Sequence, residues 1–196
     1  MRKIMDVKEA VLSRRSIRAY EDRPIRREDL EDILEAGMYA PSAVNFQPWY
    51  FVAIQNPEDM KRLLQIMGQV SQKIRPALEE RFSKHPEIVE ETSQFIRQMG
   101  GAPVCILAFQ YKQDYPKSES TIAQSIGAAI ENMLLTAAGK GIGSCWLTAP
   151  VETGMGQELR DTFAPEAGRM AALLTFGYPA RIPKAPARKE GRYIIL

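Results

Sequence analysis

The pattern of apolar and polar positions predicts two helices in the N-terminal part of the chain. Asp6 and Glu9 have the spacing of a capping box, and apolar residues recur at helical spacing behind them, so a first helix is expected over residues 6–13. Apolar positions in residues 26–40 also repeat with helical spacing. This second helix is expected to end before Pro41, at the start of the sequence PSAVNFQP.

Four short apolar runs, rich in β-branched and aromatic residues, predict buried strands. The runs span residues 49–54, 103–110, 142–147 and 170–178. Strands separated by helices indicate one α/β or α+β domain around a central sheet, covering residues 1–196. The last segment, RYIIL, is also β-prone and could complete a sheet in this chain or in a partner.

The other periodic segments predict helices of different character. Residues 58–99 are charged and helical in period, with breaks expected near positions 68, 76 and 86, which predicts two or three surface helices. Residues 121–140 have small and apolar side chains and little polar face, so this long helix is expected to be buried, at a subunit contact. A short helix is expected over residues 156–163.

The charge balance of the whole chain is close to neutral, with 26 Lys and Arg against 24 Asp and Glu. This balance argues against the broad basic surface of a nucleic-acid-binding protein. One local cluster differs from it: the sequence SRRSIRAY places Arg14, Arg15 and Arg18 directly after the first helix. Taken alone, the cluster is compatible with a helix cap, a nucleic-acid contact or a phosphate site.

Cysteine and histidine content argues against a metal site. Cys105 and Cys145 lie in apolar runs, and with His85 as the single histidine no zinc-ligand spacing can be assembled. Two buried free thiols in a reducing compartment are expected. Acidic residues precede any apolar run at the N-terminus, and no run approaches the roughly 18 apolar residues of a membrane span, so a cytoplasmic protein without a membrane partner is expected.

Several catalytic motifs are missing from the sequence. It has no Walker A loop, HExxH or GxSxG motif, and the glycines of GKGIGS follow a predicted helix and precede a strand, the reverse of a dinucleotide fingerprint. These absences argue against hydrolysis, phosphoryl transfer and zinc chemistry. A chain poor in catalytic side chains but rich in arginines, hydroxyls and amides at turns is typical of an enzyme whose cofactor supplies the chemistry.

Four motifs in series, SRRSIRAY, APSAVNFQPW, AAIENMLLTAAGKGIGSCWL and FGYPA with a later RK, resemble the FMN-dependent nitroreductase family. The resemblance covers essentially the whole chain and is weakest over residues 68–101. It implies an α+β nitroreductase-like fold, with a central mixed β-sheet surrounded by helices, and an intertwined homodimer with FMN at its interface. Residues 68–101 would then form the substrate lid and residues 180–196 a C-terminal extension.

By this resemblance, Arg14, Arg15 and Ser16 hold the phosphate and ribityl chain of FMN. Guanidinium groups suit this role because they match phosphate oxygens bidentately. Arg18 corresponds to a basic residue near the pyrimidine edge of the flavin, where negative charge collects on reduction. A solvated cluster that complements the helix dipole is the alternative.

The sequence PSAVNFQP matches the family's loop that reaches the flavin of the other subunit. The resemblance therefore implies that Pro41, Ser42, Ala43 and Asn45 cover the ring and ribityl chain across the dimer interface. An ordinary helix-to-strand turn, in which serine and asparagine satisfy the backbone, is the alternative.

The strand end in IGSCWLTAP is expected near the flavin N5. By resemblance, Leu147, Thr148 and Ala149 approach N5, with a backbone N–H or the Thr148 hydroxyl as donor. Many family members have glycine at the position of Thr148 or Ala149, so a threonine hydroxyl here could stabilise one-electron reduced flavin, as in the iodotyrosine deiodinase branch. A threonine that only ends the strand is the alternative, and the adjacent Trp146 is expected in the core.

Two further pairs of residues are candidates for FMN binding, although their match to the family's sequences is weaker. Arg188 and Lys189 match C-terminal basic residues that close over the phosphate, although other basic residues of the tail, Arg181 among them, offer alternative registers. Gln69 and Lys73 match an amide and a lysine near the polar edge of the ring.

The resemblance implies an NAD(P)H-dependent oxidoreductase. Hydride would pass from NADH or NADPH through flavin N5 to small acceptors such as nitroaromatics, quinones or flavins, by a ping-pong mechanism without a dedicated side-chain acid or base. The alternatives are a reductive dehalogenase, an ene-type reductase, a flavin-fragmenting enzyme, or a flavin-binding or storage protein without turnover. No nucleic-acid partner is expected, because the overall charge is nearly balanced.

Overall fold

The computed structural model describes residues 5–111 and 118–196, in which helices alternate with the strands of one sheet. The elements are α1 (Val7–Ser13), α2 (Arg27–Met38), β1 (Trp49–Ile54), α3 (Pro57–Arg81), α4 (Pro86–Gln98), β2 (Val104–Gln110), α5 (Glu119–Gly139), β3 (Gly143–Leu147), α6 (Ala149–Glu152), α7 (Gly156–Phe163) and β4 (Met170–Gly177). Single 3₁₀ turns, η1 (Ala43–Asn45) and η2 (Met99–Gly101), precede β1 and β2. The α+β class predicted from the sequence is confirmed.

The sheet has the strand order β1-β2-β4-β3, and each neighbouring pair of strands is antiparallel. Thr175 of β4 lies between Cys105 of β2 and Cys145 of β3 in the register. In the described residues, a parallel pairing occurs as an isolated bridge between Ser16 and Ser144. The mixture of parallel and antiparallel pairings expected of the sheet therefore comes from the N-terminal segment.

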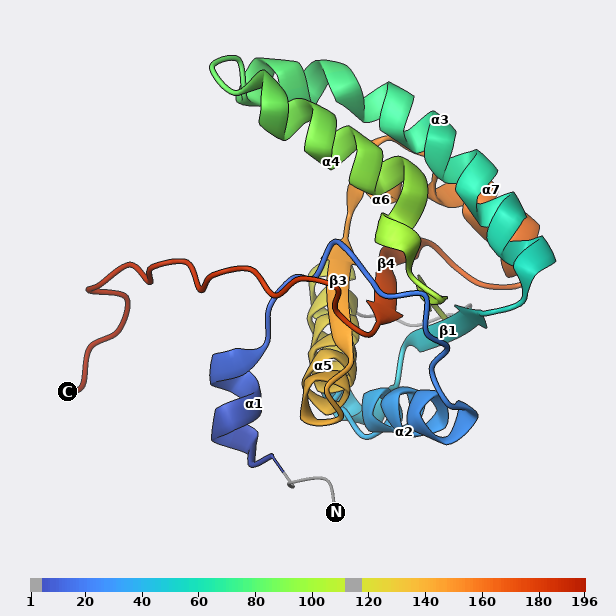
Figure 1. Ribbon diagram of the computed structural model, residues 1–196. Coiled ribbons are helices and arrows are strands. Elements are labelled where there is room, and N and C mark those ends of the chain that lie inside the picture. The colour runs from blue at the N-terminus through green and yellow to red at the C-terminus, as the bar shows by residue number, and fades with distance from the viewer. Residues whose placement is uncertain (1–4, 112–117) are drawn as a thin grey trace.

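Helices cover both faces of the sheet, as Figure 1 shows, with α2 and α5 on one side and α3, α4, α6 and α7 on the other. Alternate residues of β2 enter the two cores: Leu107 and Phe109 pack with α3 and α7, whereas Ile106 and Ala108 pack with α2 and α5. Because a strand buried on both faces has no polar side, the continuous apolar run of β2 is explained.

The helical segment after β1 is the main departure from the sequence prediction. The sequence predicts breaks near Gly68 and Pro76, whereas α3 runs without a break from Pro57 to Arg81. A buried stripe along α3, including Leu63 and Met67, packs into the core, and each such side chain contributes about 1.5–3 kcal/mol. The stripe outweighs the roughly 1 and 3 kcal/mol that glycine and proline cost inside a helix.

Helices α3 and α4 form a hairpin, drawn at the top of Figure 1. The buried hydroxyl of Ser71 donates to the Ser93 carbonyl at 2.8 Å, and the Arg75 guanidinium pairs with Glu90 at 3.1 Å. Residues 58–99 therefore contain two helices, within the expected number, but both helices bury one face instead of lying wholly on the surface.

The long helix α5 is buried as predicted. Ile126, Ile130 and Met133 are almost fully buried, and α5 packs along α2 and under the sheet. The C-terminal segment RYIIL, by contrast, forms no strand in this chain and is exposed, in a tail that leaves the body of the molecule (Figure 1).

A carboxylate in the first turn of α2 ties that helix to the end of α5. The Asp29 side chain is 1% exposed and accepts hydrogen bonds from Arg26 Nε at 2.8 Å and from Lys140 Nζ at 3.0 Å. Lys140 also pairs with Asp32, whose side chain is 54% exposed. The hydrogen bond from Arg26 is the main reason that the pKa of Asp29 falls to about 2.

We predict that Asp29→Ala lowers the free energy of unfolding by about 1.5–3 kcal/mol at pH 7, because Arg26 and Lys140 lose a charged acceptor at a buried position. The pKa of Asp29 is lower in the folded chain than its ordinary 3.8, so this contribution is complete above about pH 4 and disappears as the pH falls toward 2. Urea unfolding at pH 7 and pH 3 measures both effects. Asp32→Ala is the control and should cost less than about 1 kcal/mol; equal losses for the two variants would contradict the assignment.

Candidate active site

The N-terminal arginine segment is held against the sheet by its own backbone. Helix α1 ends where the Arg14 amide donates to the Ala10 carbonyl at 2.9 Å. The chain then runs extended, and the Ile17 amide donates to the Ser144 carbonyl of β3 at 2.8 Å. Three residues later, the Tyr20 amide donates to the Gly100 carbonyl at 3.0 Å, which joins the segment to η2.

Ile17 and Tyr20 are the buried anchors of this segment. The Tyr20 hydroxyl donates to the Ile17 carbonyl at 2.8 Å and also hydrogen-bonds the Thr175 hydroxyl at 2.7 Å. Burial raises the pKa of Tyr20 far above its ordinary value, so the hydroxyl stays neutral. Ile17 lies so close to Gly143 that a Cβ there would come within 2.6 Å of its side chain, which explains the glycine at the start of β3.

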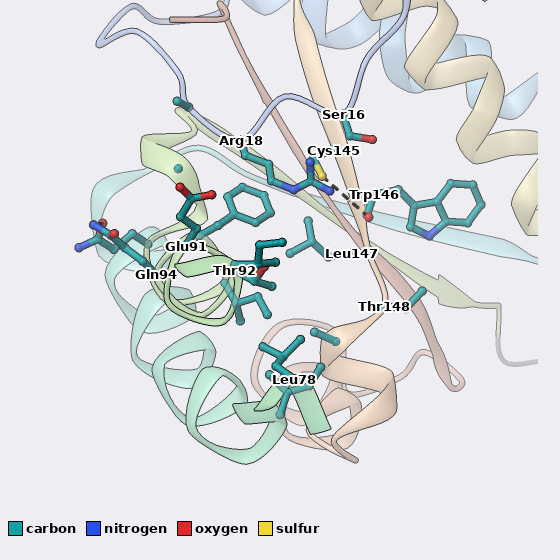
Figure 2. A pocket seen from close by; sticks show the side chains of 18 of the residues that line it. Ser16, Arg18, Leu78, Glu91, Thr92, Gln94, Cys145, Trp146, Leu147 and Thr148 are labelled. Atoms are coloured by element: carbon teal, nitrogen blue, oxygen red, sulfur yellow. Dashed lines mark hydrogen bonds between the residues drawn. The ribbon is translucent and has the colours of Figure 1, made fainter. Parts of the chain in front are cut away.

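A cavity of about 1030 Å³ lies beside this segment. Its walls come from residues 16–19, from the end of β3 and the start of α6, and from the facing sides of α3 and α4 (Figure 2). Ile74, Leu78 and Phe95 give the helical wall an apolar surface. The cavity thus combines an apolar wall with polar groups from distant parts of the sequence, as ligand sites commonly do.

Five of the residues predicted from the sequence meet at this cavity. Ser16 and Arg18 lie on the N-terminal segment, whereas Leu147, Thr148 and Ala149 lie at the junction of β3 and α6. Ile17, between them, is buried, and Ser16 and Arg18 on either side of it line the cavity. The structure therefore brings together residues about 130 positions apart in the sequence.

The charge of Arg18 is available to a ligand. Its guanidinium lies 5.8 Å from the ring centroid of Phe95, and it forms no ion pair with any residue in 5–111 or 118–196. Arg18 also lowers the pKa of the adjacent Cys145 thiol, although burial has the larger effect and raises it. The cysteine is therefore a neutral wall residue next to an unpaired cation.

Thr148 is the last residue before α6, and both of its oxygens are engaged. The hydroxyl donates to the Glu152 carboxylate at 2.5 Å, and the carbonyl accepts from the Val151 amide at 2.8 Å and from the Glu152 amide at 3.0 Å. The next residue, Ala149, is buried.

Arg14 and Arg15 lie next to the cavity in sequence but outside its lining. The Arg14 guanidinium pairs with Glu131 of α5 at 3.5 Å, and Arg15 donates to the carbonyls of Leu12 and Arg14 at 2.8 and 2.7 Å. In this chain, the two residues thus cap α1 and join it to α5.

The loop of Pro41, Ser42, Ala43 and Asn45 is also outside the cavity of its own chain. Its backbone is unusual, since Val44 and Asn45 have φ of 49° and 55°, in the left-handed region that side chains disfavour. The Ser42 hydroxyl accepts from the Gln47 amide at 2.9 Å and thereby helps to hold the turn.

Gln69 and Lys73 do not line the cavity. Both are exposed on α3, and Lys73 Nζ donates to Met155 Sδ at 2.9 Å. Ile74 and Leu78, on a different face of the same helix, line the cavity instead. The buried stripe of α3 fixes the rotation of the helix and turns positions 69 and 73 away from this cavity, so the structure does not bring the predicted ring-edge amide and lysine to it.

The C-terminal tail brings a different basic residue to the cavity from the pair expected. Arg181 and Pro183 line it, and the Ala180 amide donates to the Ala19 carbonyl at 3.0 Å. Arg188 and Lys189 lie farther along the exposed tail, outside the cavity of this chain.

Sequence analysis did not identify several lining residues. Trp146 is 39% exposed and lines the cavity, although the sequence favours a core position. The exposure of Trp146 could have been predicted, because side chains alternate along a strand and Trp146 points to the opposite side from the buried Cys145 and Leu147. Glu91 and Glu152 had no such signal, since exposed glutamates on helices are common.

Within residues 5–111 and 118–196, no group of three or more histidine, cysteine or acidic side chains is arranged to hold a metal ion. In the same residues, no helix has the length and apolar character needed to cross a bilayer.

Comparison with known proteins identifies the family of the chain. A model of the Nitroreductase family matches residues 11–178. The chain belongs to this family. Membership confirms the resemblance carried by the four sequence motifs and, with the names of the relatives, the prediction of an oxidoreductase enzyme.

Three relatives of this nitroreductase-family chain illustrate the range of similarity. A protein of Archaeoglobus fulgidus named as an NADH dehydrogenase/NAD(P)H nitroreductase is 33% identical over 173 residues, covering 86% of this chain and 83% of that protein. A crystal structure of a nitroreductase with bound FMN from Bacteroides fragilis is 28% identical with a TM-score of 0.73, covering 97% and 98% of the two chains. Iodotyrosine deiodinase 1 of Rattus norvegicus is 27% identical over 189 residues, covering 93% of this chain and 65% of that protein.

We predict that Gly100→Ala disturbs the site more than Gly101→Ala. Both glycines have positive φ, 63° and 74°, so both substitutions strain the backbone. A Cβ at Gly100 would also lie 2.4 Å from the Arg18 carbonyl oxygen, whereas a Cβ at Gly101 meets open space. Urea unfolding should show an additional loss of about 1–3 kcal/mol for Gly100→Ala, and equal losses would contradict this account.

Proposed function

We propose that this protein is an FMN-dependent oxidoreductase that uses NAD(P)H to reduce small acceptors. The observation that carries the proposal is one cavity that joins Ser16 and Arg18 to the strand end at Thr148 and Ala149. Family membership and a solved neighbour with bound FMN support it. Two buried free cysteines, Cys105 and Cys145, agree with a reducing compartment such as the cytoplasm.

The residues around the cavity fit a flavin and a second planar molecule. Its volume of about 1030 Å³ lies just above the range of about 300–1,000 Å³ that is typical of ligand pockets. The donor set, a serine hydroxyl and a guanidinium without an ion-pair partner in the described residues, suits an electron-rich ring system with a phosphate tail. FMN held by these residues would supply the redox chemistry, the transfer of hydride and electrons between nicotinamide and acceptor.

The chain's own residues then have separate tasks. Arg18 stabilises negative charge at the pyrimidine edge of the ring, while Ser16 binds nearer the ribityl chain. Thr148 and Ala149, which line the same cavity, would hold the ring near its N5. Ile74, Leu78 and Phe95 exclude water from the face where nicotinamide and acceptor bind in turn, which predicts ping-pong kinetics.

A homodimer is part of this proposal, because much of the expected FMN site lies outside the cavity of one chain. The loop of Pro41 to Asn45 would cover the flavin of the partner, and Arg14, Arg15, Arg188 and Lys189 would reach its phosphate. Exposed apolar side chains on α1 and at the end of the tail support association of two chains. They are Val7, Leu12, Tyr193, Ile194, Ile195 and Leu196.

The acceptor class is the broadest part of the proposal. Nitroaromatics, quinones and flavins fit the apolar surface that Ile74, Leu78 and Phe95 present to the cavity. The similarity to iodotyrosine deiodinase 1 supports a second candidate, reductive dehalogenation by one-electron steps. Accumulation of one-electron reduced flavin during anaerobic titration would favour the dehalogenase, and strict two-electron reduction the nitroreductase.

The decisive experiment is the visible spectrum of the protein incubated with FMN and freed of excess flavin. We expect a bound flavin spectrum that bleaches anaerobically with NADH or NADPH and returns when a nitroaromatic or quinone is added. Failure to retain FMN would refute the proposal, whereas retention without bleaching by either nucleotide would indicate a flavin-binding protein without turnover.

We predict different effects for the arginines. Replacing both Arg14 and Arg15 by alanine should weaken FMN binding about tenfold or more, because each charged hydrogen bond to phosphate contributes roughly 1.5–3 kcal/mol. Arg18→Ala should leave FMN bound but lower its midpoint potential, because a cation near the reduced ring is lost. Fluorescence titration and anaerobic redox titration measure the two effects; an unchanged potential in Arg18→Ala would disprove its role.

A further inference from the structure

The hydrogen bond between Thr148 and Glu152 connects the proposed N5 contact to a carboxylate at the cavity. The two residues lie one helical turn apart, with the Glu152 amide 3.0 Å from the Thr148 carbonyl and the Thr148 hydroxyl 2.5 Å from the Glu152 carboxylate. Both residues line the cavity. The short helix α6 thus holds the two side chains together without help from another element.

This bond determines whether the Thr148 hydroxyl can act as a donor or as an acceptor toward a ligand. A hydroxyl has one hydrogen to donate and two lone pairs, and an ionised carboxylate can only accept. The hydrogen is therefore committed to Glu152, and the oxygen has only acceptor capacity left for a ligand. A bond to an ionised acceptor is about twice as strong as one between neutral groups, so the Thr148 hydroxyl favours Glu152 over a neutral acceptor.

Nothing else in the described residues competes for the Glu152 carboxylate. It forms no ion pair with the lysines, arginines or histidine of residues 5–111 and 118–196. The other glutamate at the cavity, Glu91 of α4, has no hydrogen bond to Thr148. Glu152 is thus the group that sets the direction of the hydroxyl.

We propose that Glu152 is a positioning residue that makes Thr148 a hydrogen-bond acceptor toward the flavin and thereby favours its reduced state. This inference rests on the proposed function. Oxidised flavin has a bare N5 that needs a donor, whereas hydride transfer adds one hydrogen and two electrons to the ring, after which N5 carries an N–H. A Thr148 oxygen that can only accept matches the reduced ring and leaves N5 of the oxidised ring without this donor.

The test compares Glu152→Gln with Glu152→Ala in FMN-loaded protein. Both variants remove the negative charge, and the glutamine side chain keeps a carbonyl acceptor for the Thr148 hydroxyl that alanine lacks. Freed from its acceptor, the Thr148 hydroxyl can donate to the bare N5. At a fixed potential, the ratio of reduced to oxidised flavin should be about tenfold lower in Glu152→Ala than in Glu152→Gln, an effect of one hydrogen bond. For a two-electron couple this is a midpoint potential about 30 mV lower.

Two matched controls accompany the comparison. In a Thr148→Val background the Gln and Ala variants at position 152 should have the same midpoint potential, because no hydroxyl remains to redirect. Glu91→Gln and Glu91→Ala should also agree with each other, since Glu91 does not bind Thr148.

The outcomes separate this inference from the proposed function. Equal potentials for Glu152→Gln and Glu152→Ala, in protein that binds FMN and is reduced by NAD(P)H, would overturn the role of Glu152 alone. A difference that persists with Thr148→Val would overturn it as well. A wild-type protein that retains no FMN would overturn both proposals.

Discussion

The site depends on the way the segment from Ser16 to Tyr20 is fastened to the sheet. Backbone bonds from Ile17 to β3 and from Tyr20 to η2 fix its path, and the Tyr20 hydroxyl buries a polar link to Thr175 at the centre of the sheet. An unsatisfied hydroxyl at that depth would cost roughly 1–3 kcal/mol, so the bond to Thr175 favours this path of the segment over others. The direction of Arg18 follows from this arrangement.

The sheet with its two cores explains why the cavity lies where it does. Both faces of β2 are covered, so the sheet offers no open surface for a ligand. Space remains beside β3, where the strand meets the N-terminal segment and stops at Thr148, and where the hairpin of α3 and α4 leans over the edge. The candidate active site is thus confined to the junction at which β3 ends and α6 begins.

Most of the fold could be predicted from the sequence. For β1, β2, β4, α5 and α7, the spacing of apolar residues and the turn residues at the ends of each element agree with the packing. It failed along α3, where local penalties at Gly68 and Pro76 are smaller than the burial of a long apolar stripe. At the site, motifs located Arg18 and Thr148, since strand ends are visible in sequence. Gln69 lies outside the cavity, and Glu152 was not predicted, because helix rotation and a side-chain bond between neighbouring turns have no signature in a single sequence.

The left-handed turn at Val44 has a consequence for assembly. A β-branched residue at positive φ stores strain of order 1–3 kcal/mol, which the rest of the turn must offset. A loop that is ordered before two chains meet loses less conformational entropy on association. In the homodimer proposed above, a loop of this kind would associate at a lower entropic cost and would help to keep the flavin that it covers bound.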